Sequence, residues 1–192
     1  MPQQSSAKTN IIKTAARLFQ EQGYHGTGLN QIISESGSPK GSLYHYFPKG
    51  KEELAVAAIE RTSQKVRERL IAGLDSDKDP GTMLSDFVTA IADAYDHGHK
   101  ENGLPVAAIA LEMATQHESI RQACEEAYES WFQVLKEKLI ASGVRHQNPA
   151  VLAEMCNALI EGAFISVRIK GHTEPLRQAA SMMPALVYKQ NG

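Results

Sequence analysis

The chain alternates between segments whose apolar residues recur every three or four positions and short polar segments with glycine and proline. This spacing is typical of amphipathic helices, and no segment is convincing as a strand. We therefore expect an all-α protein, in which residues 1–9 form a loosely ordered polar segment. The expected helices cover residues 10–22, 29–36, 39–47, 51–73, 82–97, 105–115, 118–142, 149–170 and 174–190.

Residues 149–170 have apolar side chains around most of the predicted helix. A surface helix needs an apolar stripe only a little over about 100° wide, so this helix requires partners on two sides. One partner is the chain's own core, and we expect the other to be a second copy, contacted through Ala158, Gly162, Ile165 and Ile169. A helix that is simply central to the monomer is the alternative.

Two short helices joined by a tight corner are predicted within residues 26–47. Gly37 ends the first helix, Ser38 supplies an N-cap for the second, and Pro39 takes its first helical position. This is a helix-turn-helix layout. Gly41 costs the second helix about 0.5–1 kcal/mol relative to alanine, so either a phosphate approaches its backbone or a neighbouring helix packs closely there.

The sequence K-G-S-L-Y-H-Y-F at 40–47, followed by K-E-E-L at 51–54, resembles the recognition helix and following segment of the TetR family of bacterial transcriptional regulators. The resemblance extends back through A-A-R-L-F at 15–19 and covers roughly residues 8–60. It implies an N-terminal three-helix helix-turn-helix domain, residues 1–50, and a C-terminal helical bundle for ligand binding and dimerisation, residues 51–192. A dimer of such chains would read a near-palindromic double-stranded DNA operator with two recognition helices.

In this interpretation Lys40 is the candidate for a guanine edge, whereas the aromatic side chains of the same helix divide between bases and phosphates. Thr27 and Ser42 would contact the DNA backbone. This chain has one residue more than most members of the resembled family between Phe47 and the K-E-E-L segment. Either Lys49 or Lys51 therefore takes the place of the lysine that contacts a phosphate in that family. The full set of expected DNA contacts is Thr27, Ser38, Lys40, Gly41, Ser42, Tyr44, His45, Tyr46, Lys49 and Lys51.

The charge distribution agrees with one surface that faces phosphates. The whole chain has a net charge of −2, but residues 1–51 contain six basic and two acidic side chains. A basic end on an acidic body favours a protein that contacts nucleic acid through one surface. It argues against a protein that coats nucleic acid along its length. A chance excess of charge is the alternative.

Residues 51–192 contain no metal-ligand spacing, phosphate-binding loop or nucleophile elbow, so we expect neither a cofactor nor a metal. The pair His97 and His99 is interpreted as solvated. A small apolar or aromatic effector is the expected input, bound in a region whose residues can equally be plain core. The candidate residues are Phe87, Ile91, Tyr95, Met113, Trp131, Phe132, Met155, Asn157 and Phe164, with Gln116 as a further polar contact.

The resemblance further implies that the final two helices form the dimer, which adds Leu176, Ala179 and Met183 to the expected interface. It also implies that the ligand shifts the helix at 51–73 and releases the DNA. The run G-L-P-V-A-A-I-A-L-E at 103–112 resembles a subgroup of these repressors that is linked to drug-efflux and flavonoid-catabolism genes. Pro184 is expected to kink or break the last helix.

Cys124 and Cys156 lie among apolar residues at helical spacing, which indicates buried thiols in a reducing cytoplasm. The longest uninterrupted apolar run is 104–111, far short of the about 20 residues that a membrane span needs, so we expect a cytoplasmic protein without a membrane partner. Two other functions are considered. One is an enzyme with a helical appendage, and the other is a DNA-binding regulator without ligand input.

Overall fold

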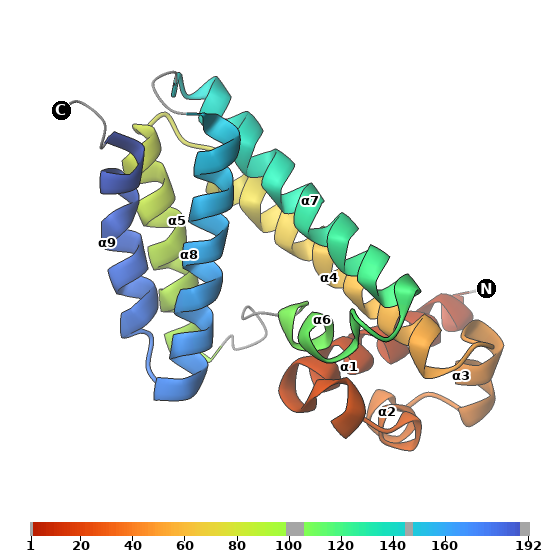
Figure 1. The fold of residues 1–192 in the computed structure, drawn as a ribbon. Helices are drawn as coiled ribbons and strands as arrows, with labels where there is room; N and C mark the ends of the chain where they lie inside the picture. Colours follow the sequence, from red (N-terminus) through yellow and green to blue (C-terminus); the bar gives the residue numbers. More distant parts are fainter. Residues whose placement is uncertain (1, 99–105, 145–147, 189–192) are drawn as a thin grey trace. The chain divides into compact units, whose positions relative to one another are not determined.

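The computed structural model describes residues 2–98, 106–144 and 148–188, with side chains described from residue 7 onward. These ranges are helical and contain no strand, which confirms the all-α prediction for them (Figure 1). The helices are α1 (Pro2–Gly26), α2 (Leu29–Ser36), α3 (Lys40–Tyr46), α4 (Lys51–Gly73), α5 (Pro80–Asp96), α6 (Ala107–Met113), α7 (Glu118–Ala141), α8 (Pro149–Lys170) and α9 (Glu174–Tyr188).

Helix α1 begins much earlier than expected. The predicted loose segment is instead its first two turns, which begin at Pro2. Proline is favourable at a first helical position, and no helix-breaking residue follows before Gly23. At Gly23 the backbone leaves helical geometry, with φ 77° and ψ 175°, so the predicted end of the first helix is present as a kink.

The chain divides into two compact units. The first unit comprises Met1–Lys65 and Pro105–Tyr128. Within it, α1 packs against α2, α3 and α6. Its buried residues include the predicted inward face of α1, together with the inward residues of the next two helices: Ile11, Ala15, Leu18, Phe19, Ile32 and Leu43.

The second unit comprises Val66–Leu104 and Glu129–Gly192, and within it α9 packs against α5 and α8. Leu176, Ala179 and Met183 are almost completely buried in this packing. Their assignment to the dimer interface was therefore wrong, because the apolar stripe of α9 is consumed by helices of its own chain. Met182, which is 52% exposed, lies on the other side of α9.

Helix α9 continues through Pro184, so of the two predicted outcomes, a kink or a break, the break does not occur. The proline packs against Gly81 near the start of α5, where a Cβ atom on the glycine would lie 2.8 Å from Cα of Pro184. Asp79 caps α5 by accepting a hydrogen bond from the Thr82 N–H at 3.0 Å, and it also accepts one from the Tyr188 hydroxyl. The first turn of α5 is thus fastened to the last turns of α9.

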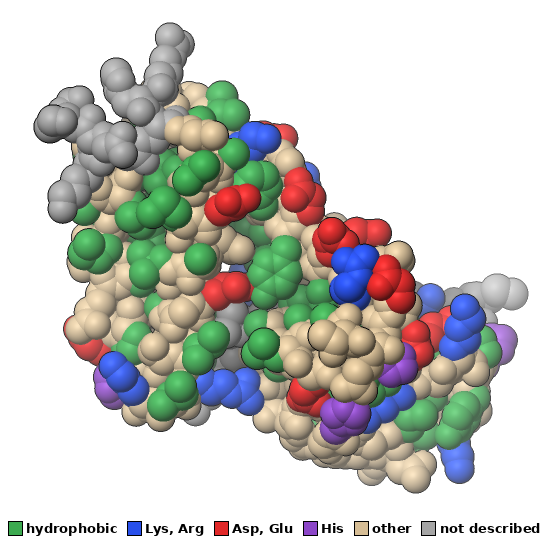
Figure 2. All heavy atoms as spheres, viewed as in Figure 1, with side chains coloured by type: hydrophobic (Ala, Val, Ile, Leu, Met, Phe, Trp, Pro, Cys, Tyr) green, Lys and Arg blue, Asp and Glu red, His purple; other side chains and the backbone are tan. Residues whose placement is uncertain are grey.

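Helix α8 combines a buried face with an exposed apolar face. Leu152, Cys156 and Val167 are buried, whereas Ile165 is 45% and Ile169 79% exposed. Figure 2 shows apolar side chains at the surface over α8 and α9. Among the described residues, α8 is the one helix long and apolar enough to cross a membrane by length and composition. Counting uninterrupted apolar runs did not reveal this property.

Both cysteines are buried and unpaired, as predicted. Burial raises the pKa of the Cys124 and Cys156 thiols to about 11, so both are protonated at neutral pH. A thiol that is protonated and buried is a poor nucleophile, so these side chains act as small apolar core residues.

Candidate nucleic-acid interface

Helices α2 and α3 meet at the tight corner that the sequence predicts. Gly37 has φ 62°, a left-handed conformation, and its N–H bonds to the Ser34 carbonyl oxygen at the end of α2. The N-cap of α3 is Pro39, one residue later than expected. Ser38 is not a cap, because its buried hydroxyl donates to the Ala7 carbonyl oxygen at 3.5 Å. The Ser38 side chain is therefore buried facing α1, which corrects its assignment as a DNA contact.

Helix α3 separates its apolar residues from its polar ones. Leu43 and Phe47 are buried, whereas Lys40 and His45 are exposed. Tyr44 is 47% exposed. The two remaining predicted contacts of this helix, Ser42 and Tyr46, are half-buried. This short helix thus presents amine, imidazole and phenol groups to the outside.

The surroundings of Gly41 decide between the two explanations of this glycine. Gly41 is exposed, and within the described part of the chain no neighbouring element lies within 4 Å of the position that a Cβ would take. Close packing against another helix is therefore not the reason for glycine here. The open backbone at the start of α3 leaves close approach of an external group as the remaining explanation.

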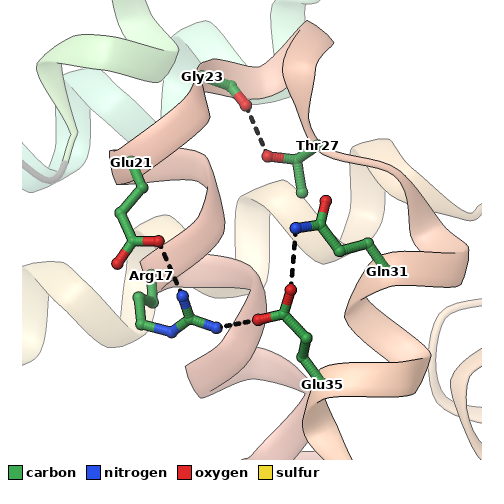
Figure 3. A network of polar contacts seen from close by, with 6 residues as sticks. All are labelled: Arg17, Glu21, Gly23, Thr27, Gln31 and Glu35. Atoms are coloured by element: carbon green, nitrogen blue, oxygen red, sulfur yellow. Dashed lines mark hydrogen bonds and ion pairs between the residues drawn. The ribbon is translucent and has the colours of Figure 1, made fainter.

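Thr27 is buried, with only 1% of its surface exposed. Its hydroxyl donates to the Gly23 carbonyl oxygen at 2.8 Å (Figure 3). The prediction that this side chain contacts DNA is therefore wrong. Thr27 instead fixes the connection between the α1 kink and α2, a role that the sequence did not reveal because threonine suits both positions.

The two alternative lysines have different environments. Lys49 is exposed. The Lys51 amine lies 4.4 Å from the centroid of the Tyr24 ring, and partial burial lowers its pKa while the Glu112 carboxylate opposes that shift. The structure therefore favours Lys49 as the residue that is available to a phosphate.

A polar network holds α2 against α1 (Figure 3). Arg17 bonds to Glu21 at 2.8 Å and also to Glu35, which in turn accepts a hydrogen bond from Gln31 at 2.9 Å. The Gln31 amide, followed by the Arg17 guanidinium, lowers the pKa of the Glu35 carboxyl. Arg17 is thus engaged within the protein, and the basic character of this end depends on its lysines.

The predicted effector residues do not form one group. Met113 is buried in the first unit and Gln116 is exposed there, whereas the others belong to the second unit. Met155 is 49% exposed on α8 and cannot line an enclosed site within its own chain, which corrects that assignment. Trp131 and Phe164 are buried, and the half-buried members are Phe87, Ile91, Tyr95, Phe132 and Asn157.

Phe87 packs directly over α4. A Cβ on Gly73 would lie 2.5 Å from the Phe87 ring, so this ring fills the space beside the glycine. Within the described ranges, no group of three His, Cys, Asp or Glu side chains could hold a metal ion. His97 donates from Nδ1 to the Asp93 carbonyl oxygen at 2.7 Å, and His99 lies outside the described residues.

Sequence reasoning also missed Glu112. This α6 carboxylate accepts hydrogen bonds from the backbone N–H groups of Tyr24 and His25 in α1. No local pattern could predict a contact between residues 87 and 88 positions apart in the sequence.

Comparison with known proteins agrees with this geometry. Residues 11–58, a range that includes α2 and α3, match the family described as bacterial regulatory proteins, tetR family. Residues 80–182 match the family described as transcriptional regulator LmrA/YxaF-like, C-terminal domain. The two matches together include parts of both compact units.

Similar proteins share nearly the whole chain. The uncharacterized HTH-type transcriptional regulator YxaF of Bacillus subtilis is 38% identical over 99% of this chain and 100% of its own length. The HTH-type transcriptional regulator LmrA of the same organism is 37% identical, over 94% of this chain and 96% of its own.

Solved structures have the same fold. A TetR transcriptional regulator from Chloroflexus aurantiacus covers 99% of this chain and 98% of its own, with 26% identity and a TM-score of 0.83. The reduced form of Escherichia coli NemR, at 23% identity, covers 93% of this chain and 95% of its own with a TM-score of 0.82. The chain therefore belongs to the TetR family and is a DNA-binding transcriptional regulator.

Proposed function

We propose that this protein is a ligand-released repressor that binds a near-palindromic operator as a homodimer. The polar surface of α3 is the observation that carries this proposal. Lys40, Tyr44 and His45 are exposed on a helix whose apolar residues face inward, and Gly41 leaves the backbone open beside them. A protein named as the transcriptional repressor NemR is 25% identical over 94% of this chain, which supports repression.

The α8 face supports the dimer. Ala158, Gly162, Ile165 and Ile169 are exposed and follow one another at helical spacing, so they form a stripe along one side of the helix. The two small residues allow a second helix to approach, and the two isoleucines supply apolar area that is costly to leave in water. A second copy of the same stripe, related by two-fold symmetry, is the occupant that we propose.

The dimer is tested by sedimentation of the full chain with Ile165→Glu, and Ile140→Glu serves as the matched control. Ile140 is 53% exposed on α7 and lies outside the proposed stripe. The proposal expects Ile165→Glu to shift the protein to monomers at micromolar concentration and to weaken DNA binding, while Ile140→Glu remains dimeric. A wild-type chain that sediments as a monomer at that concentration contradicts the proposal.

The effector is proposed to be a small apolar or aromatic molecule bound in the second unit. Trp131 and Phe164 are buried there, and Phe132, Tyr95 and the Asn157 amide are half-buried. Aromatic walls with few polar groups suit an apolar ligand. Binding would favour one position of α4 and thereby release DNA.

A regulator without ligand input is the alternative function, and an enzymatic role finds no support because the similar proteins are named as regulators. The two regulatory functions are separated by a panel of flavonoids and hydrophobic aromatic compounds. The proposal expects at least one compound to raise the melting temperature and to release the protein from a selected genomic fragment. If no compound does either, the ligand-free alternative is favoured.

We propose that the protein acts in the cytoplasm.

A further inference from the structure

The kink in α1 leaves backbone donors without partners inside the helix. Gly23 is not helical, so the turn that follows begins like a new helix. The first N–H groups of a helix have no carbonyl oxygen within the helix to bond to. Glu112 of α6 supplies both missing acceptors. Its Oε1 accepts from the Tyr24 N–H at 3.2 Å, and its Oε2 accepts from the His25 N–H at 2.9 Å.

Gly23 is required by this arrangement for two reasons. Its φ of 77° lies in the region that side chains disfavour, and a Cβ there would lie 1.9 Å from Oε1 of Glu112. The Gly23 carbonyl oxygen meanwhile accepts the Thr27 hydroxyl hydrogen bond that leads into α2. The carboxylate and the glycine together therefore define how the chain enters the helix-turn-helix.

The same contact extends to α4. Tyr24 stacks on Phe19 with ring centroids 5.6 Å apart, and its ring also faces the Lys51 amine. The negative charge of Glu112 favours the charged form of Lys51. One carboxylate of α6 thus lies where α1, the start of α2 and the start of α4 are joined.

Glu112 and its partners come from different parts of the sequence. Glu112 lies in the segment 80–182 that matches the C-terminal family description, and Tyr24 and His25 lie in the segment 11–58 that matches the DNA-binding one. All three residues nevertheless belong to the first compact unit. We infer that Glu112 is a positioning residue for DNA binding, which holds the α1 kink, and through it α2 and α3, in the arrangement that binds the operator.

The test uses the full chain and a genomic DNA fragment selected by the wild-type protein, without effector. Glu112→Gln keeps the shape but places an amide donor against one of the two backbone N–H groups. Glu118→Gln is the matched control, because this exposed carboxylate in the same unit bonds to Arg121 and Gln122 of its own helix. Both variants remove one negative charge, so a general electrostatic effect on DNA binding cancels.

We expect Glu112→Gln to bind the selected fragment about five- to tenfold more weakly than Glu118→Gln, a loss of the size of the net contribution of one ordinary hydrogen bond. Amide hydrogen exchange at Tyr24 and His25 should become faster in Glu112→Gln alone. Exchange in the core of α5 and α9 and affinity for a scrambled duplex should match the control. These readouts separate positioning from general stability.

Three results would overturn the inference. The first is equal affinity of the two variants for the selected fragment despite faster exchange at Tyr24 and His25. The second is unchanged exchange at these two amides, which would show that the hydrogen bonds to the Glu112 carboxylate do not hold the kink. The third is unfolding of Glu112→Gln at assay temperature, which would show a general structural role. Failure of the wild-type protein to select any fragment would instead contradict its function as a sequence-specific regulator.

Discussion

The amine of Lys51 lies over the ring of Tyr24, 4.4 Å from the ring centroid. A lysine held in this way gives up freedom to reach a phosphate. The Tyr24 ring is buried, and a cation over an aromatic ring contributes about 0.5–1 kcal/mol at an exposed site and about 2 kcal/mol when it is desolvated. Lys49, two residues earlier, is exposed, and its backbone N–H bonds to the Glu53 carboxylate at 2.9 Å. The two lysines therefore have separable roles.

The first prediction concerns the salt dependence of DNA binding. Lys49→Gln should reduce the slope of log K against log salt by about 0.9, the value of one lost phosphate contact, and weaken all sequences alike. Lys51→Gln should leave the slope nearly unchanged and lower the melting temperature. Titrations between about 50 and 200 mM salt measure both effects. A reduced slope for Lys51→Gln alone would reverse the assignment.

Gly41→Ala is predicted to stabilise the protein while it impairs DNA binding. Alanine removes the cost of a helical glycine, about 0.5–1 kcal/mol, and the added methyl group meets no neighbouring element within 4 Å among the residues that the structure describes. On the DNA side, the same methyl group stands where the backbone is proposed to approach a phosphate. Thermal unfolding and operator affinity should therefore move in opposite directions. Unchanged affinity would show that nothing approaches Gly41.

Gly81→Ala is predicted to have the opposite effect on stability. Its Cβ would lie 2.8 Å from the Pro184 Cα and 2.8 Å from the Tyr188 ring, and a backbone atom cannot move aside cheaply. Such overpacking costs about 1–3 kcal/mol, or roughly 2–12 °C in melting temperature for a chain of this length. Gly41→Ala is the control with the same change in composition. Equal melting temperatures for the two variants would contradict the tight packing of α9 on α5.

The Asp79 cap makes the second unit sensitive to acid. Hydrogen bonds from the Thr82 side chain, then from the Tyr188 hydroxyl, lower the pKa of Asp79 from 3.8 to about 2. Because the folded-state pKa is the lower one, the cap stabilises fully above pH 4, and this contribution is lost as the pH falls toward 2. Tyr188→Phe should therefore lower the melting temperature at pH 7 more than at pH 2.5. An equal loss of melting temperature at both pH values would show that the contribution of Tyr188 does not depend on the charge of Asp79.

The sequence predicted the helices well because their apolar residues repeat with the helical period and because glycine marks their ends. Gly37 and Gly23 have the positive φ values that end or kink a helix. The α8 stripe was also visible, since apolar residues on all sides of a helix require a second partner.

The sequence could not predict which helix each apolar face meets. Leu176 and Met183 have the spacing of an interface, but their partner is α5 or α8 of the same chain. Thr27 suits a phosphate contact and an internal hydrogen bond equally well, and only the structure shows its burial. The Glu112 contact depends on tertiary packing over 88 residues and leaves no local pattern.

The most direct test of α3 as the reading helix compares the base preferences of Lys40→Ala and Lys78→Ala in selection from a randomised duplex library. Lys78 is an exposed lysine of the second unit that pairs with Asp86, so it controls for the loss of charge. We predict that Lys40→Ala relaxes the preference at one base pair in each half-site, at a cost of about 1–3 kcal/mol, while Lys78→Ala keeps the wild-type preferences. Identical base preferences for wild type and Lys40→Ala would contradict the account.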